Sequence, residues 1–366
     1  MTRHFYIDRL RVLLTGLVIF HHTAITYGAS GGWFYRERAT DASASSQLLT
    51  LFCAVNQSFF MGAFFLLAGL YVPTALERKG AKTFLKERLV RLGLPVLAFG
   101  LLLGPLTVML ARLRDGSRSA PIFEKLPLFE LGPLWFPWSL LLFSMGYVLL
   151  RAFFPKAQLR LQTPMPSNAA WMRAAIGVGL AALLLRQWVP VGHSVLGLQL
   201  GYFASYVFLF SLGCAAASRD WIERLSWPQA RLWLIVSLLA IPLLPMAISL
   251  AARISSAPQN FSGGLNISSI TYAFWEPLVA WGIIAALLVV FRQRFNFAHA
   301  RWDRWGRQAY GAFVVHAPIT VALSTALSGW AAPALVKFAL IGSLAVITSF
   351  FVSGVMLRAK WVQRAL

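Results

Sequence analysis

The chain has 366 residues, of which 58% are hydrophobic and only 12% charged, and its 33 basic and 12 acidic side chains give a net charge of +21. A soluble globular protein cannot bury so large an apolar fraction, and here the apolar residues fall in blocks of about 20, the length that crosses a bilayer. The composition therefore excludes a soluble domain and predicts an all-α polytopic membrane protein whose principal partner is the lipid bilayer.

Neither the charge nor the cysteines require another kind of partner. A strongly basic soluble chain would suggest nucleic acid, but the cytoplasmic loops of membrane proteins are themselves rich in Lys and Arg. We therefore expect no nucleic-acid partner. Cys53 and Cys214 both lie in apolar blocks and have no metal-ligand spacing. A bound metal is therefore not expected.

Ten apolar segments are predicted to span the membrane. They are residues 10–28, 48–75, 89–111, 133–154, 173–191, 195–217, 231–252, 269–291, 307–328 and 333–357. If the N-terminus is cytoplasmic, most Lys and Arg residues fall in the inner connections, as membrane topology favours. We therefore predict that both termini are cytoplasmic and that residues 1–366 form a single integral membrane domain.

The first span carries ionisable side chains near both of its ends. Its sequence DRLRVLLTGLVIFHH begins at Asp8 and includes Arg11 near the start and His22 at the end. On an α-helix Arg11 and His22 share one face about 16 Å apart along the axis, and Asp8 lies one turn from Arg11. Ionisable groups inside a membrane helix are costly and indicate a functional site by default. This helix is predicted to form one wall of a reaction chamber.

The third span is preceded by the basic stretch ERKGAKTFLKERLVR, residues 77–91. Arg88 and Arg91 lie three residues apart, so an α-helix places them about one turn apart. Such residues are often ordinary topology-setting charge. The alternative is a phosphate clamp, because paired guanidinium groups bind phosphate oxygens in a bidentate manner.

Two further ionisable residues lie deep in later spans. Glu276 is the only carboxylate of its span and lies about 10 Å below the outer end, level with His22. An imidazole or an Arg is the expected partner, and a purely structural ion pair is the alternative. His316 lies about 13 Å above Arg307 and next to a proline, where it is either a hydrogen-bonded core residue or part of the site.

Other polar and aromatic groups have simpler interpretations. Asn56, Gln57 and Ser58, near the middle of the second span, are expected to hydrogen-bond a neighbouring helix, and contact with a substrate is the alternative. Trp135, Phe136 and Trp138, at the outer start of the fourth span, resemble an interfacial aromatic belt.

An ordered set of motifs resembles the acyltransferase-3 family of integral membrane acyltransferases over essentially the whole chain. The set begins with the Arg11 to His22 spacing and the paired arginines Arg88 and Arg91. The other blocks are QSFFMGAFFLLAGLYVP (57–73), KGAKTFLKERLVRLGLP (79–95), LGPLWFPWSLLLF (131–143), YFASYVFLFSLGCAA (202–216) and QAYGAFVVHAPIT (308–320). The segments ITYAFWEPLVAWG and RQRFN resemble the branch that contains glucan biosynthesis protein C, a glucan succinyltransferase. The LWFPW block departs from the family pattern, which leaves its role open.

The resemblance implies a ten-helix enzyme of the bacterial cytoplasmic membrane. Such an enzyme takes an acetyl or succinyl group from cytoplasmic acyl-CoA and delivers it to a hydroxyl of an extracytoplasmic acceptor, an envelope or exported glycan. Arg11, Arg88 and Arg91 would hold the CoA phosphates. His22 would act as general base, since imidazole titrates near pH 6.5, or would form an acyl-histidine intermediate.

Glu276 and His316 are the other candidate catalytic residues, and their roles, like that of Asp8, are less defined in this hypothesis. Asp8 or Glu276 would orient or charge-balance the site, and His316 would contact the acyl group or the acceptor.

Two other classes of protein remain open from the sequence. A secondary transporter or flippase would use Arg11, His22 and Glu276 as a proton relay, since transporters also have many helices with buried charges. A structural scaffold of an envelope assembly is the third class.

Overall fold

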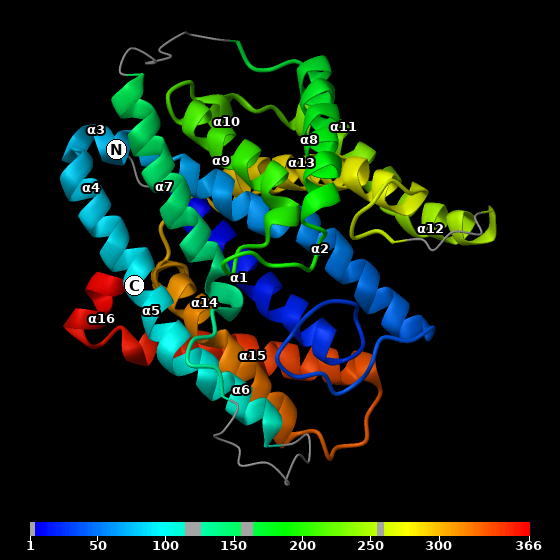
Figure 1. Ribbon diagram of the computed structural model, residues 1–366. Coiled ribbons are helices and arrows are strands. Elements are labelled where there is room, and N and C mark those ends of the chain that lie inside the picture. Colours follow the sequence, from blue (N-terminus) through cyan, green and yellow to red (C-terminus); the bar gives the residue numbers. More distant parts are fainter. Residues whose placement is uncertain (1–3, 114–125, 155–163, 255–259) are drawn as a thin grey trace. The chain divides into compact units, whose positions relative to one another are not determined.

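The structure is a computed structural model, and it describes residues 4–113, 126–154, 164–254 and 260–366 (Figure 1). Most of these residues are helical, and isolated bridges take the place of strands among them. The helices are α1 (Phe5–Thr26), α2 (Ala44–Gly69), α3 (Val72–Lys79), α4 (Ala81–Arg88), α5 (Leu94–Ala98), α6 (Gly104–Arg112), α7 (Trp135–Phe153), α8 (Asn168–Trp188), α9 (Phe203–Ala217), α10 (Trp221–Arg224), α11 (Trp227–Ala240), α12 (Leu243–Ile254), α13 (Ile267–Arg294), α14 (Ala300–Ala326), α15 (Ala334–Met356) and α16 (Lys360–Ala365).

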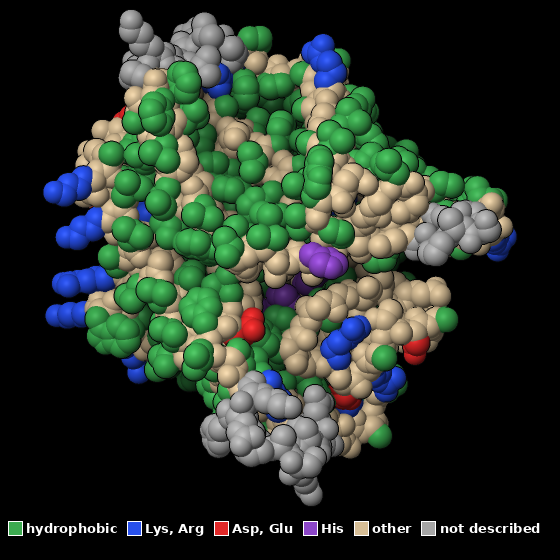
Figure 2. Space-filling view, viewed as in Figure 1, with side chains coloured by type: hydrophobic (Ala, Val, Ile, Leu, Met, Phe, Trp, Pro, Cys, Tyr) green, Lys and Arg blue, Asp and Glu red, His purple; other side chains and the backbone are tan. Residues whose placement is uncertain are grey.

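Nine helical stretches within the described residues are long and apolar enough to cross a membrane. They correspond to the second to tenth predicted spans, so the prediction of an all-α polytopic membrane protein is confirmed. Helix α1 is not among them, because its arginines and histidines lower its mean hydropathy. Its 22 residues extend for about 33 Å, which is still the thickness of the hydrocarbon core. Hydrophobic side chains cover much of the visible surface, as expected of a protein solvated by lipid (Figure 2).

The sixth span begins later than the sequence predicts. Val195 and Leu198 pair in a short bridge, and the backbone has positive φ at Leu196 and Gly197. A helix cannot pass through two such residues. The span therefore begins only with a 3-10 turn at Leu200–Tyr202, which leads into α9 at Phe203, rather than at residue 195.

The chain divides into two compact units. Unit 1 consists of Met1–Asn56, Lys86–Leu141 and Phe297–Leu366, and unit 2 of Gln57–Leu85 and Leu142–Asn296. In unit 1, α14 packs against α1, α15 and α6. In unit 2, α13 packs against α11, α8 and α12.

Glycines allow the helices of unit 2 to approach closely. A Cβ atom on Gly69 of α2 would lie 2.3 Å from the carbonyl oxygen of Phe210, and one on Gly213 of α9 would lie 2.2 Å from that of Leu66. The two helices thus cross backbone to backbone. Small residues at such crossings are typical of membrane helices, which associate through packing rather than through the hydrophobic effect.

The helix from Ala81 to Arg112 contains two π-helical turns, Leu89–Gly93 and Phe99–Leu103, and both turns lie in unit 1. Pro95 has no N–H to donate to the carbonyl of Arg91, four residues earlier. The Tyr310 hydroxyl of α14 donates to that carbonyl instead, at 3.0 Å. The irregular turn therefore ties the arginine-bearing segment to α14, the helix that carries His316.

The start of α1 is fixed by an arginine that the sequence analysis did not single out. Arg9 is 1% exposed, donates a hydrogen bond to the carbonyl of Phe297 and lies 4.2 Å above the Phe297 ring. The buried guanidinium thereby attaches the first turn of α1 to the segment that leads into α14.

Candidate functional site

Two histidines from distant parts of unit 1 meet in its interior. His22 of α1 and His316 of α14 have ring centroids 5.4 Å apart and nearly parallel planes, at 16°. His316 is fully buried, whereas His22 is half-buried. Each was predicted separately as a candidate catalytic residue, and the packing of α1 on α14 brings them together.

Trp33, from the connection after α1, covers one face of His22. Their ring centroids are 3.8 Å apart with an interplanar angle of 12°, and the Trp33 and His316 centroids are 6.0 Å apart at 11°. The three centroid distances form a triangle rather than a line. Trp33 therefore stacks on His22, while His316 lies beside His22 with its ring plane nearly parallel to that of His22.

The backbone fixes the tautomer of His316. Its Nδ1 lies 2.6 Å from the carbonyl oxygen of Phe313. Because a carbonyl only accepts hydrogen bonds, Nδ1 carries the proton and Nε2 of the neutral ring carries a lone pair. The aromatic ring of Phe136, at 5.8 Å from the Phe313 ring, packs against the same turn. Phe136 is thus a packing residue of this site as well as part of the aromatic block that begins α7.

Two ring nitrogens of the pair lack a hydrogen-bond partner. They are Nε2 of His316 and Nδ1 of His22, and both atoms are buried. Buried polar atoms are normally hydrogen-bonded, and a specific exception requires an explanation. Hydroxyl groups placed beside the rings would satisfy such nitrogens, since a hydroxyl donates to a nitrogen that carries a lone pair and accepts from one that carries a proton.

The segment that carries Trp33 is firmly attached to unit 1. Lys337 of α15 forms an ion pair with Glu37, Arg38 donates to the carbonyl of Ala332 at 3.1 Å, and Ser46 donates to the carbonyl of Gly28 at 2.6 Å. These contacts hold the connection over the end of α1. Trp33 was not predicted from the sequence; the one available signal was an aromatic residue shortly after a span that ends in histidine.

Of the predicted cationic residues, Arg11 lies toward the opposite end of α1 from His22. Arg11 is 3.6 Å from Asp8, as the one-turn spacing predicts. Arg88 is half-buried and Arg91 exposed, so the π-helical turn does not give the two residues equal surroundings. Along α14, Tyr310, which holds the Arg91 carbonyl, is six residues or about 9 Å from His316.

A second group of arginines surrounds a cavity of about 770 Å³ in unit 1. Arg304 and Arg307, one turn apart on α14, and Arg358, after α15, line it together with the aromatic side chains of Trp305 and Phe350. Val12, the neighbour of Arg11, also lines it. From the sequence these arginines were predicted to be topology-setting charge. Their convergence depends on the packing of three helices.

Glu276 lies in unit 2 and has an arginine as its partner. Arg186 of α8 and Glu276 of α13 form an ion pair in which neither side chain is exposed beyond 1%. Ser205 donates to the second carboxylate oxygen at 3.3 Å, and the ring of Tyr272 lies 4.9 Å from the guanidinium carbon. Of the two partner types expected from the sequence, the structure provides the arginine.

The polar residues of α2 behave as expected of helix-to-helix contacts. Asn56 donates to the carbonyl of Leu17 in unit 1 at 3.1 Å, and Gln57 donates to the hydroxyl of Tyr206 in unit 2 at 2.9 Å. Neither requires a catalytic role.

The fold and these sites define a multi-spanning helical membrane protein with a buried imidazole pair and an arginine-rich end in one unit. The acyltransferase-domain model of the acyltransferase-3 family matches residues 4–358, nearly the whole chain, and the protein belongs to that family. It is therefore a membrane acyltransferase. A comparison with curated proteins gave no match.

Proposed function

We propose that this acyltransferase moves an acetyl or succinyl group from cytoplasmic acyl-CoA to a hydroxyl of an extracytoplasmic glycan. The observation that carries the proposal is the imidazole pair His22 and His316, whose partnerless buried nitrogens suit the binding and deprotonation of a hydroxyl. The other premises are the proposed cytoplasmic position of both termini, the single domain over residues 1–366 and a bacterial cytoplasmic membrane.

In the proposed reaction His22 accepts the proton of the acceptor hydroxyl as its oxygen attacks the thioester carbonyl carbon. The carbon–sulfur bond then breaks, the new ester forms, and the proton held by His22 passes to the departing sulfur as free CoA. A half-buried imidazole can meet both substrates. His316, with its Nδ1 proton donated to Phe313, offers only a lone pair at Nε2, which suits it to accept a hydrogen bond from a second hydroxyl of the glycan and so orient the acceptor.

Trp33 is proposed to hold His22 in its reactive orientation. Stacking at 3.8 Å restricts rotation of the imidazole about its side-chain bonds. The Trp33 segment also covers the end of α1, which favours exclusion of water from the reacting thioester.

The donor is proposed to bind at the arginine-rich end of unit 1. Arg11, Arg88 and Arg91 would contact phosphates, as the family resemblance implies, and the 770 Å³ cavity of Arg304 and Arg307 has room for the nucleotide part. The distance along α1 from Arg11 to His22, about 16 Å, is comparable to an extended pantetheine arm.

Glu276 is proposed to have a charge-balancing role. Its carboxylate neutralises Arg186 within unit 2, and each of its oxygens has a hydrogen-bond donor. A group satisfied in this way is poorly placed to exchange protons with a substrate.

The experiment that tests the proposal uses purified protein in proteoliposomes with acetyl-CoA or succinyl-CoA and a glycan acceptor. Release of free CoA thiol that depends on the acceptor, together with a glycan ester detected by mass spectrometry, is the expected result. No thiol release with either donor, with correctly folded protein, would reject acyl-CoA as the donor. The ester mass identifies the acyl group.

A further inference from the structure

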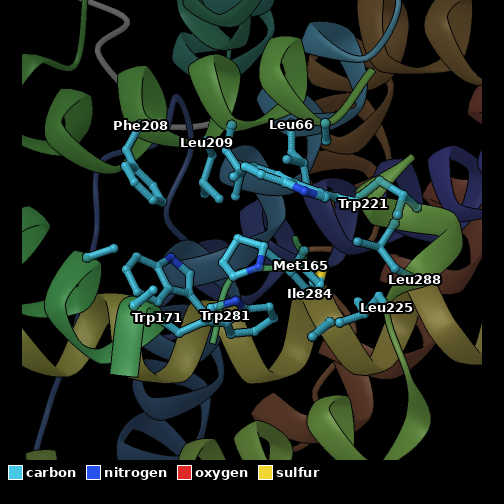
Figure 3. A pocket seen from close by; sticks show the side chains of 17 residues that line it. Leu66, Met165, Trp171, Phe208, Leu209, Trp221, Leu225, Trp281, Ile284 and Leu288 are labelled. Atoms are coloured by element: carbon cyan, nitrogen blue, oxygen red, sulfur yellow. The ribbon is translucent and has the colours of Figure 1, made fainter. Parts of the chain in front are cut away.

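Unit 2 contains an apolar cavity of about 280 Å³ that the proposed chemistry does not use (Figure 3). Its walls come from α2, α8, α9, α10 and α13 together with the connection before α8. Figure 3 shows Trp281, Ile284 and Leu288 rising from α13 on one wall, with Leu66 and Leu209 on the opposite wall. All of the lining residues are apolar.

The size and lining of the cavity indicate a hydrocarbon guest. A dry apolar cavity of 150 Å³ accommodates benzene, so about 280 Å³ accommodates a hydrocarbon of about ten carbons. Water is a poor occupant because the walls offer it no hydrogen-bond partners. An empty cavity of this size would forfeit packing contacts and destabilise the unit. In a protein surrounded by lipid, the hydrocarbon at hand is an acyl chain.

Two cations adjoin the same walls. The guanidinium carbon of Arg219 lies 4.9 Å from the ring of Trp221, and Arg292 donates hydrogen bonds to the carbonyls of Ile222 and Leu225. All three of these partner residues line the cavity. Within the described parts of the chain, neither arginine has a carboxylate at ion-pair distance, and Nε of Arg219 is buried without a hydrogen-bond partner.

We propose that this cavity binds one acyl chain of an anionic phospholipid from the cytoplasmic leaflet, with the lipid phosphate on Arg219 and Arg292. Both arginines belong to connections predicted to face the cytoplasm, where anionic lipids are concentrated and basic pockets between helices bind their headgroups. The site is distinct from the imidazole pair, and the inference does not depend on the proposed donor or acceptor.

The test uses phosphatidylglycerol with a photoreactive diazirine in one acyl chain, with the full-length protein in nanodiscs. After irradiation, crosslinked peptides are mapped by mass spectrometry. Labelling is expected on peptides that contain Trp221 and Trp281, and excess unlabelled phosphatidylglycerol is expected to compete at least five-fold better than phosphatidylcholine. Equal competition by the two lipids would overturn the assignment of an anionic headgroup.

A second test fills the cavity by substitution and repeats the labelling. Ala174→Phe and Ala285→Phe place a ring in the space for the acyl chain and are expected to reduce this labelling at least five-fold. Ala181→Phe, on an exposed position of α8, is the matched control and should leave labelling unchanged. Undiminished labelling of a filled variant that retains the wild-type melting temperature would overturn the proposal. If the variant at the buried Ala285 does not fold, the variant at the half-buried Ala174 provides the test.

A third test removes the arginine charges and so distinguishes binding of the lipid headgroup from binding of the acyl chain. Arg219→Gln and Arg292→Gln together are expected to reduce the preference for phosphatidylglycerol over phosphatidylcholine at least three-fold, because the guanidinium charges are removed. Arg253→Gln, at the end of α12 outside the cavity lining, is the control. An unchanged preference in the double variant would remove these two arginines from the site.

Discussion

Unit 1 and unit 2 each bury ionisable side chains within membrane helices, but the two units satisfy them differently. In unit 2, Arg186 and Glu276 neutralise each other, and the carboxylate receives a further hydrogen bond from Ser205. In unit 1, His22 and His316 lie ring beside ring and leave one buried nitrogen each without a partner. A satisfied buried pair stabilises a particular packing, whereas unsatisfied polar atoms in an enclosed site are available to a ligand.

The largest expected effect is on the rate of acyl transfer, when the proposed base in unit 1 is removed. His22→Gln is expected to lower acyl transfer by about 10²- to 10⁴-fold, the usual contribution of general base catalysis, because the amide cannot take the proton of the hydroxyl. Release of CoA thiol in proteoliposomes measures the rate, and the melting temperature should be unchanged. Turnover within a few-fold of wild type would remove His22 from the chemistry.

The corresponding change in unit 2 should affect stability instead. Glu276→Leu leaves the buried Arg186 without its counter-charge and is expected to cost about 3 to 5 kcal/mol of stability, seen as a lower melting temperature. The double variant Arg186→Met with Glu276→Leu removes both charges and should recover most of that loss. Wild-type stability in the single variant, combined with an abolished kcat, would instead favour a catalytic role for Glu276.

A smaller effect is expected from the arginine-lined cavity of unit 1. Arg304→Gln and Arg307→Gln together should raise KM for acyl-CoA by about 10- to 100-fold with little change in kcat, since charge-assisted hydrogen bonds to phosphate contribute about 1.5 to 3 kcal/mol. Arg301→Gln, on the same helix but outside the cavity lining, is the matched control. If Arg88→Gln alone reproduces the whole KM effect and the cavity variants do nothing, donor binding belongs to the π-helical turn.

The smallest effect is expected at Trp33. Trp33→Ala removes the stacking partner of His22 and should lower kcat by about 3- to 10-fold, in line with about 0.5 to 1.5 kcal/mol for an aromatic pair. Trp33→Phe retains a ring and should restore most of the rate. A rate that does not differ between the Ala and Phe variants would show that stacking does not position His22.

Several elements of this site could be recognised from local spacing. The separation of Arg11 and His22 follows from helical periodicity, and the Asp8 contact with Arg11 follows from a one-turn spacing. Glu276 could be identified as costly because it lies in an apolar span. Arg186 and Lys337, lone cations in apolar stretches, offered the same signal and were not used.

Other features depend on residues far apart in the chain. Periodicity did not reveal that α1 and α14 place His22 beside His316, or that Trp33 stacks on the pair. The partner of Glu276 could not be predicted either, because an imidazole and an arginine would both neutralise its charge. The π-helical turn at Arg91 was also not predicted, and the hydroxyl that bonds the Arg91 carbonyl there comes from Tyr310 of another helix.

The amino-acid sequence by itself determined the class of the protein. Blocks of apolar residues about 20 long must form helices in a membrane, because only internal hydrogen bonds can satisfy the backbone there. The tertiary structure decided which buried ionisable groups neutralise each other and which remain open to a ligand. That outcome depends on the few ångströms between side chains of different helices, a distance that local pattern and hydropathy do not specify.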